Sequence, residues 1–316
     1  MNSIIKTWCG IFSVSPKVAF WNAMTSFHLN SKLRSNLTLS FVDKHHKTVI
    51  AYLEKNYEGI INKYKSTAKV HNKALNNIWM LWWQGYDKAP ELVKRCIYSV
   101  HSSFKNYNIV VLTESNYKNY IHLPDYIITK FKEGKISFAQ LSDIIRLTAL
   151  AEYGGIWMDA TILCGTNVPD ISNFDFFSLN TGYDKNSFYV TKGRWTGFFM
   201  GSRIKGYPFF CFARDLIYAY WKKEKALIDY FLIDYIIQLG YIELEDFHND
   251  VDSLNVTCPN VLKILDCFKE NRARELKECF SNSNWCFKLD YRKYTPYNPD
   301  TKAIYDMIID DYQFLL

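Results

Sequence analysis

Residues 139–164, AQLSDIIRLTALAEYGGIWMDATILC, contain a predicted helix followed at once by a strand. Ser137 is a suitable N-cap for this helix, and Gln140, three positions later, completes a capping box. Gly154 suits the position just after the last helical residue, where a backbone of positive φ is common. We therefore predict a helix that starts at Ser137 and ends before Gly154, and a strand at Gly155–Met158.

Two further apolar runs precede this block. Asn77–Trp83, NIWMLWW, and Tyr107–Thr113, YNIVVLT, are short and apolar, which is typical of buried strands. Pro90 opens a helix that we expect to reach about Phe104. A strand, a helix and a second strand at this spacing form a βαβ unit. The fold class is therefore α/β, with an open sheet that binds ligands at the carboxyl ends of its strands.

The first quarter of the chain has a different pattern. In residues 1–75, apolar side chains recur at helical spacing and lysines occupy the other face, whereas residues 66–77 are polar and suggest a linker. We therefore divide the chain into a basic helical region, residues 1–75, and an α/β domain, residues 76–316.

Two later helices are predicted at residues 208–223 and 228–239, and Gly240 ends the second one. Asp229 and Asp234 lie on that second helix beside tyrosines. Either these acids contact the acceptor or the reacting centre, or they are ordinary residues of a polar face.

Composition narrows the class of protein. Of the 316 residues, 48% are apolar and 17% aromatic, which argues against disorder. No apolar run is long enough for a transmembrane helix, and Met1–Pro16 lacks the pattern of a secretory signal. The eight cysteines form no C-x-x-C pair, so we expect reduced thiols rather than disulfides or a zinc site. These features predict a cytoplasmic protein.

Positive charge is concentrated near the start of the chain. Residues 1–75 carry a net charge of +8, while the whole chain carries +6, so the remaining residues sum to −2. Such a distribution suggests contact with an anionic surface. The candidates are a membrane leaflet, nucleic acid and a merely solvated basic face. Because no recognisable nucleic-acid-binding module is present, we expect no nucleic-acid partner.

Three side chains of the 139–164 block are expected to meet at one edge of the sheet. Asp143 and Arg146 share a face of the helix, and Asp159 follows the strand. A carboxylate can accept hydrogen bonds from sugar hydroxyls, a guanidinium can hold a phosphate oxygen, and a strand-end carboxylate can anchor a divalent cation. This set suits a sugar diphosphate. The alternatives are that Asp143 and Arg146 form an ordinary surface ion pair and that Asp159 caps the end of the strand.

The combined pattern SD-x-x-R followed by YGGI-x-x-D resembles the donor-binding core of glycosyltransferase family 32, and most of all its bacterial capsular-polysaccharide branch. The strand IWMLWWQG and the segment YFLIDYII extend the resemblance over residues 77–240, whereas residues 1–75 match poorly. The resemblance implies a GT-A fold, which is a Rossmann-like mixed sheet flanked by helices. It also implies a nucleotide-sugar donor, commonly UDP-linked, and transfer with retention of anomeric configuration.

The resemblance further implies which residues bind the donor. Trp82 corresponds to an aromatic residue beside the base. Ser142, Asp143 and Arg146 correspond to positions that hold the donor sugar. Asp159 corresponds to the first acid of the D-x-D triplet.

One position departs from that family. The triplet here is Asp159-Ala160-Thr161, so a hydroxyl replaces the second acid. Asp159 and Thr161 are the predicted ligands of a Mn²⁺ or Mg²⁺ ion, although a hydroxyl is a poorer ligand than a carboxylate. The alternative is that protein cations take over this role. Lys288 and Arg292, in a segment that resembles the basic C-terminal motif of the family, are the candidates, and Asp290 between them is a possible further ligand.

From these residues and the resemblance we predict a retaining hexosyltransferase of capsular or surface polysaccharide synthesis. UDP-glucose or UDP-galactose is the expected donor, and a lipid-linked oligosaccharide at the inner membrane surface is the expected acceptor. The predicted catalytic residues are Asp143, Arg146, Asp159 and Asp234. No covalent nucleophile is evident, which favours front-face departure of the diphosphate. The alternative is a non-catalytic nucleotide-sugar-binding subunit of a polysaccharide assembly complex, a reading that the missing second acid supports.

Overall fold

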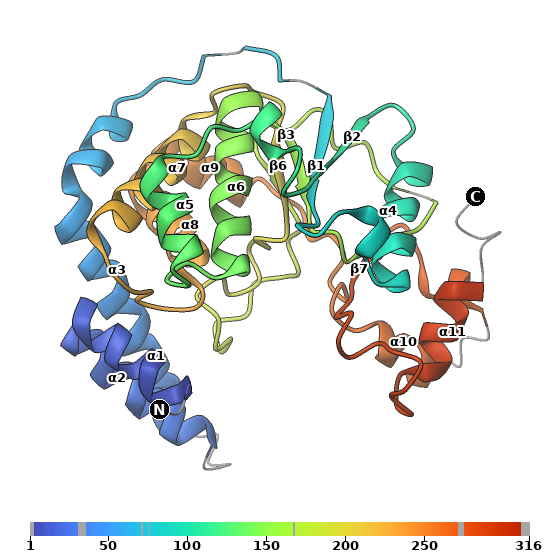
Figure 1. The fold of residues 1–316 in the computed structure, drawn as a ribbon, viewed down its shortest axis with the longest axis horizontal. Helices are drawn as coiled ribbons and strands as arrows, with labels where there is room; N and C mark the ends of the chain where they lie inside the picture. The colour runs from blue at the N-terminus through green and yellow to red at the C-terminus, as the bar shows by residue number, and fades with distance from the viewer. Residues whose placement is uncertain are drawn as a thin grey trace.

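A mixed β-sheet occupies the middle of the molecule (Figure 1). The structure is a computed structural model that describes residues 3–30, 36–70, 72–74, 76–166, 168–270 and 275–310. The strand order is β2-β1-β3-β6-β5, with β1 parallel to β2 and β3, and β6 antiparallel to β3 and β5. The bounds are β1 (Asn77–Leu81), β2 (Asn108–Leu112), β3 (Gly155–Met158), β5 (Phe177–Ser178) and β6 (Phe199–Ser202). The predicted α/β class is confirmed.

The predicted βαβ unit is formed by β1, α4 (Glu91–Ser103) and β2. Strand β1 ends at Leu81, two residues earlier than predicted. The backbone N–H of Trp82 still donates to the carbonyl of Leu112 at 3.0 Å, but the chain then turns and Gly85, at φ 87°, donates back to the Trp82 carbonyl. The end of β1 therefore places Trp82 at the carboxyl edge of the sheet.

Helix α6 (Phe138–Tyr153) begins and ends where the sequence predicts. Ser137 and Gln140 form the capping box in both directions, and Gly154 closes the helix at φ 68°. A Cβ atom at Gly154 would lie 2.5 Å from the Cβ of Ala74, so only glycine fits this turn. The turn leads directly into β3, and this fixes Asp143 and Arg146 relative to Asp159.

A second, two-stranded sheet joins two distant parts of the chain. β4 (Ile162–Cys164) pairs antiparallel with β7 (Cys286–Lys288), a pairing that the sequence did not predict. β7 lies beside α4 in Figure 1, together with α10 (Ile264–Glu270) and α11 (Lys302–Asp310). This pairing brings Lys288 next to the chain that follows Asp159.

The other side of the sheet is covered by a helical layer (Figure 1). Its members are α5 (Asp125–Lys132), α6, α7 (Pro208–Lys223), α8 (Leu232–Glu243) and α9 (Glu245–Asp252). Short 3-10 turns connect parts of the chain, namely η1 (Tyr86–Lys88), η2 (Tyr117–Asn119) and η3 (Leu276–Cys279).

The helix predicted at residues 228–239 is wrong at both ends. α8 begins at Leu232, because Asp229 Oδ1 accepts from the backbone N–H of Phe231 at 2.8 Å and holds a turn before the helix. The helix also continues through Gly240. A Cβ atom there would lie 2.7 Å from the ring of Phe209, so this glycine permits close helix packing rather than ending α8.

In the part of the chain that the structure describes, α1 (Ser3–Val14), α2 (Pro16–Asn30) and α3 (Asn36–Lys65) precede the sheet, in the region where the sequence predicts helices. α3 packs against α7 and α8, and its buried residues Val49 and Leu53 belong to the same hydrophobic cluster as residues of those helices. The α1–α2 pair lies at the outer end of the molecule (Figure 1). Within the described ranges, no helix combines the length and the apolar character that crossing a bilayer requires.

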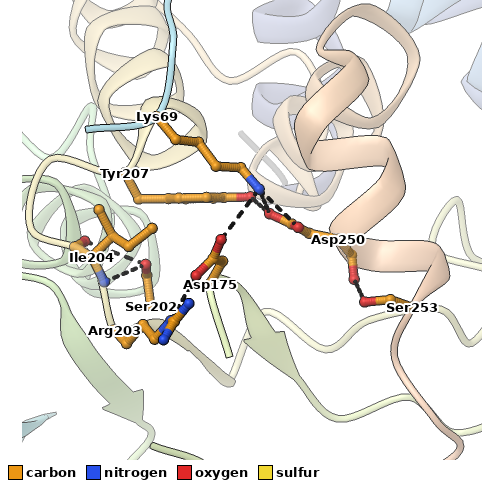
Figure 2. Close-up of polar contacts among 8 residues, drawn as sticks. All are labelled: Lys69, Asp175, Ser202, Arg203, Ile204, Tyr207, Asp250 and Ser253. Carbon is orange, nitrogen blue, oxygen red and sulfur yellow. Dashed lines mark hydrogen bonds and ion pairs between the residues drawn. The ribbon is translucent and has the colours of Figure 1, made fainter. Parts of the chain in front are cut away.

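The predicted linker is held to the body by an ion-pair network (Figure 2). Lys69 Nζ lies 2.7 Å from Asp250 Oδ2 on α9 and 3.5 Å from Asp175 Oδ2. Asp175 also accepts from Arg203 Nε at 2.7 Å, and the Tyr207 hydroxyl donates to Asp250. Because these side chains come from separate elements, the network fixes the path of the chain between α3 and β1.

Candidate functional site

The guanidinium group of Arg146 lies between two carboxylates. Its Nη1 is 3.2 Å from Asp143 Oδ1, and its Nη2 donates to Asp159 Oδ1 at 2.9 Å. The group also lies 5.1 Å from the centre of the Trp157 ring, which supports it from β3. The convergence predicted for these three charged residues is thus present in the structure.

Asp159 is the most heavily contacted acid of this cluster. Besides Arg146, the indole N–H of Trp157 donates to Oδ1 at 2.9 Å, and Lys288 Nζ donates to Oδ2 at 2.6 Å. Burial alone would raise the pKa of Asp159, but the charges of Lys288 and Arg146 outweigh it and hold that pKa below its usual value. Asp159 is therefore an anion held between two cations.

Lys288 reaches this acid because β7 pairs with β4. Ile162 lies opposite Lys288 in the ladder, and the backbone N–H of Leu289 donates to the Thr161 carbonyl at 2.9 Å. The ammonium then donates to Thr161 Oγ1 at 2.7 Å as well as to Asp159. It thus bridges the two residues that were predicted to bind a metal ion.

These residues fit a divalent cation poorly. A hard cation needs several oxygen ligands, but the two oxygens of Asp159 and the hydroxyl of Thr161 already accept from protein donors, two of them cationic. In the described part of the chain, no group of three or more His, Cys, Asp or Glu side chains is placed to hold a metal ion. Asp290, considered as a further ligand, instead accepts from the backbone N–H of Arg292 at 3.0 Å.

Two other carboxyl groups around Arg146 have raised pKa values. Burial raises the pKa of Asp143 to about 7, although Arg146 favours its ionised form. Burial likewise raises the pKa of Asp234, on α8, to about 6. A Cβ atom at Gly197 would lie 3.3 Å from Arg146 Nη1 and 3.7 Å from Asp234 Oδ1, so this glycine leaves room where the two groups approach. Perturbed carboxyl groups in such a cluster are typical of functional sites.

The cluster is partly open to solvent. The side chain of Arg146 is only 7% exposed, whereas those of Asp159 and Lys288 retain 23% and 22%. A ligand can therefore reach Asp159 and Lys288, while the more deeply buried Arg146 holds Asp159 in place.

The remaining predicted residues lie around this cluster or apart from it. Ser142 is half-buried and precedes Asp143 on α6. Trp82 is half-buried, and its ring packs edge to face on Tyr291 at 5.3 Å. Arg292 is exposed, and its guanidinium lies 5.2 Å from the ring of Tyr291. Of the two cations predicted in the C-terminal segment, Lys288 contacts Asp159, whereas Arg292 contacts Tyr291.

Comparison with known proteins shows the family to which the chain belongs. The family described as capsular polysaccharide synthesis protein matches residues 29–308. The chain belongs to this capsular polysaccharide synthesis family. The match includes α3 and the central sheet and ends within α11, and it therefore includes every residue of the cluster.

Among solved structures, the chain is similar to one titled PaToxG Glycosyltransferase. The two are 14% identical, the similarity covers 85% of this chain and 98% of that one, and the TM-score is 0.40. A search of curated proteins gave no match.

In this member of the capsular polysaccharide synthesis family, three features of the site were not predicted. They are the β4–β7 pairing, the packing of Tyr291 on Trp82, and the position of Gly197 close to Arg146 and Asp234. The alternation in WCFKLDY gives a weak strand signal, but nothing local indicates its partner.

A cavity of 530 Å³ lies elsewhere, where β3 begins and β6 ends. Its lining includes Gly155, Ser202 and Arg203, and the last of these is already paired with Asp175. This cavity is at the edge of the sheet opposite Asp159. We therefore place the site of this family member by the convergence of charged groups and not by cavity size.

Proposed function

We propose that this family member is a retaining glycosyltransferase that moves a hexose from a UDP-sugar, UDP-glucose or UDP-galactose, to a hydroxyl group of a lipid-linked oligosaccharide. The observation that carries the proposal is the position of Arg146 between Asp143 and Asp159, with Lys288 on the far oxygen of Asp159. The family description, capsular polysaccharide synthesis protein, supports a product that is a surface polysaccharide.

The site lies where an open α/β sheet binds ligands. Asp159 follows β3 and Trp82 follows β1, and these are neighbouring parallel strands that end at the same edge. In this proposal the uracil base lies against Trp82 and the diphosphate lies near Lys288. The sugar hydroxyls then contact Asp143 and Ser142 on α6.

The chain supplies positioning and charge for the reaction. The bond between the anomeric carbon and the diphosphate breaks, and its electron pair leaves with the UDP. The acceptor oxygen bonds to the same carbon on the same face, and the acceptor proton passes to an oxygen of the departing phosphate. Lys288 stabilises the growing charge, while Asp143 and Arg146 hold the sugar in place.

Asp234 is suited to orient the acceptor. Its Oδ1 is buried and has no hydrogen-bond partner in the part of the chain that the structure describes. With a pKa raised to about 6, Asp234 is mostly ionised at neutral pH and can accept a hydrogen bond from the acceptor hydroxyl.

The proposed place of action is the inner face of the cell membrane, where a lipid-linked acceptor is held. Residues 1–75 carry a net charge of +8, which favours anionic lipid. Phe12 and Phe20 on α1 and α2 are 61% and 56% exposed, and Lys17 beside them is exposed as well. Both aromatic residues precede residue 29, where the family match begins. Exposed aromatic and basic residues together suit a peripheral membrane contact.

Release of UDP from a panel of UDP-hexoses tests the proposal. We expect turnover with one of the donors and a loss of at least about a hundredfold in Asp159→Asn, because the variant no longer fixes Arg146 and Lys288. Asp306→Asn on α11 is the matched control, since Asp306 pairs with Lys302 at the surface. Near-normal turnover in a folded Asp159→Asn protein contradicts the assignment.

A nucleotide-sugar-binding subunit without catalysis is the second candidate. The observation in its favour is Thr161, which stands where the second acid of the D-x-D triplet is expected. Such a subunit binds UDP-sugars in calorimetry but releases no UDP with any donor or acceptor.

A further inference from the structure

We propose that the ammonium group of Lys288 takes the place of a divalent cation in this site, so that donor cleavage proceeds without an added metal. The inference rests on the proposed function and concerns how the same site stabilises the leaving diphosphate. It starts from the poor fit between these residues and a metal ion.

The ammonium group of Lys288 already occupies the position expected for a metal ion. Lys288 Nζ lies 2.6 Å from Asp159 Oδ2 and 2.7 Å from Thr161 Oγ1, the two atoms expected to ligate a metal. An ammonium group held at both atoms leaves no room for a metal ion between them. A second positive group, Arg146, occupies the other oxygen of Asp159 at 2.9 Å. Two protein cations around one carboxylate repel a dication.

Lys288 also has a fixed backbone. Its N–H donates to the Val261 carbonyl at 2.8 Å, and the next residue, Leu289, donates to Thr161 at 2.9 Å. The ammonium also lies 5.4 Å from the centre of the Phe198 ring. A lysine held from three sides is pre-organised and needs little rearrangement when negative charge develops.

The Lys288 ammonium group has more N–H donors than Asp159 and Thr161 use. An ammonium group has three N–H bonds, and Asp159 and Thr161 use two of them. The side chain of Lys288 remains 22% exposed, so the third N–H can meet a phosphate oxygen from the open side. Lys288 keeps its proton throughout and acts only by charge and hydrogen bonding.

The charges around Asp159 give Thr161 a role. Arg146 and Lys288 bring two positive charges to the single negative charge of Asp159. Asp143 and Asp234 lie toward Nη1 of Arg146, so they chiefly offset the charge of the guanidinium. A carboxylate at position 161 would add a negative charge directly beside Lys288, whereas a hydroxyl adds none and leaves more of the ammonium's charge for a diphosphate.

The test uses the full chain and the donor that it cleaves. UDP release is measured in EDTA and again with added Mn²⁺, and we expect rates within about twofold of each other. Lys288→Met keeps the length of the side chain but removes the charge, and kcat should fall by about 10²–10³-fold. Lys293→Met is the matched control, since Lys293 is exposed in the same segment and lies against Tyr294.

A double variant gives a gain of function. Thr161→Asp combined with Lys288→Met restores two acids and removes the competing cation, so Mn²⁺ should raise its rate at least about tenfold over EDTA. Wild-type cleavage that requires Mn²⁺ and stops in EDTA overturns this inference and leaves the proposed function intact. No cleavage of any donor under either condition overturns both. The comparison of wild-type rates in EDTA and with Mn²⁺ needs no variant. It therefore decides whether donor cleavage requires a metal even if Lys288→Met fails to fold.

Discussion

Nε2 of His45 lies 2.8 Å from Oδ2 of Asp229, and the two residues are 184 positions apart in the chain. Both side chains are buried, and the contact joins α3 to the turn just before α8. The next histidine, His46, lies with its Nδ1 2.7 Å from the Tyr235 hydroxyl. Because α8 carries Asp234, the N-terminal helices support one wall of the candidate site.

Asp229→Ala should therefore destabilise the protein by about 1–3 kcal/mol, because it leaves a buried imidazole without its partner. Denaturant unfolding measures this change. Asp43→Ala is the control: Asp43 is 50% exposed and pairs with the exposed Lys47 one turn away, so its loss should cost less than about 0.5 kcal/mol. Equal effects of the two variants would mean that the His45 contact contributes nothing to stability.

The local parts of this site could be predicted from sequence. The capping box at Ser137 and the turn at Gly154 fix the ends of α6, and a spacing of three places Asp143 and Arg146 on one face. Because β3 begins directly after α6, Asp159 at the end of β3 is expected to lie near Asp143 and Arg146.

The contact of Lys288 was not predictable in the same way. Lys288 and Asp159 are 129 positions apart, and their contact depends on the β4–β7 pairing, in which the register of two short strands is set by tertiary packing. The start of α8 was misplaced for a related reason. The apolar pattern continues from Ile228 to Leu232, but Asp229 is held by His45 and by the N–H of Phe231, so the turn there is not helical.

The pKa of Asp143 gives a prediction for stability against pH. Burial raises this pKa to about 7 in the folded protein, while an unfolded Asp has a pKa of about 3.9. The folded state then binds more protons between about pH 4 and pH 7. This contribution to the free energy of unfolding is present below pH 4 and is lost as the pH rises to about 7.

Asp143→Asn should remove that contribution, so that the free energy of unfolding falls less steeply between pH 4 and pH 7. Urea titrations at several pH values measure the slope. Asp234 adds a smaller decline of the same sign, because burial raises its pKa to about 6, and the comparison is therefore between wild type and variant. An unchanged slope would show that Asp143 ionises normally.

Gly197→Ala tests the spacing between Arg146 and Asp234. The new methyl group would lie 3.3 Å from Arg146 Nη1, closer than most side-chain contacts, and the guanidinium must shift by a few tenths of an ångström. A small displacement of an orienting group lowers turnover, so we expect kcat/KM for the donor to fall about tenfold.

The matched control is Gly59→Ala, on the exposed face of α3, where a Cβ atom meets nothing within 4 Å. Alanine should stabilise this helix by about 0.5–1 kcal/mol and leave kcat/KM unchanged. If both variants retain wild-type kcat/KM, the gap at Gly197 has no part in positioning the site.

The exposed aromatic residues of α1 and α2 lead to a prediction on membrane binding. If Phe12 and Phe20 enter the lipid interface, replacing both by Ser removes apolar burial that contributes about 1.5–3 kcal/mol for each ring. Flotation with vesicles that contain phosphatidylglycerol should then fall at least about tenfold.

Salt should weaken the binding of the wild-type chain as well, since it screens the charge of residues 1–75. Tyr297→Ser is the control, because Tyr297 is 92% exposed and belongs to the segment between β7 and α11, two elements that Figure 1 shows away from α1 and α2. A double variant that floats as well as this control would show that the two phenylalanines do not contact lipid, and charge alone would then have to account for any binding.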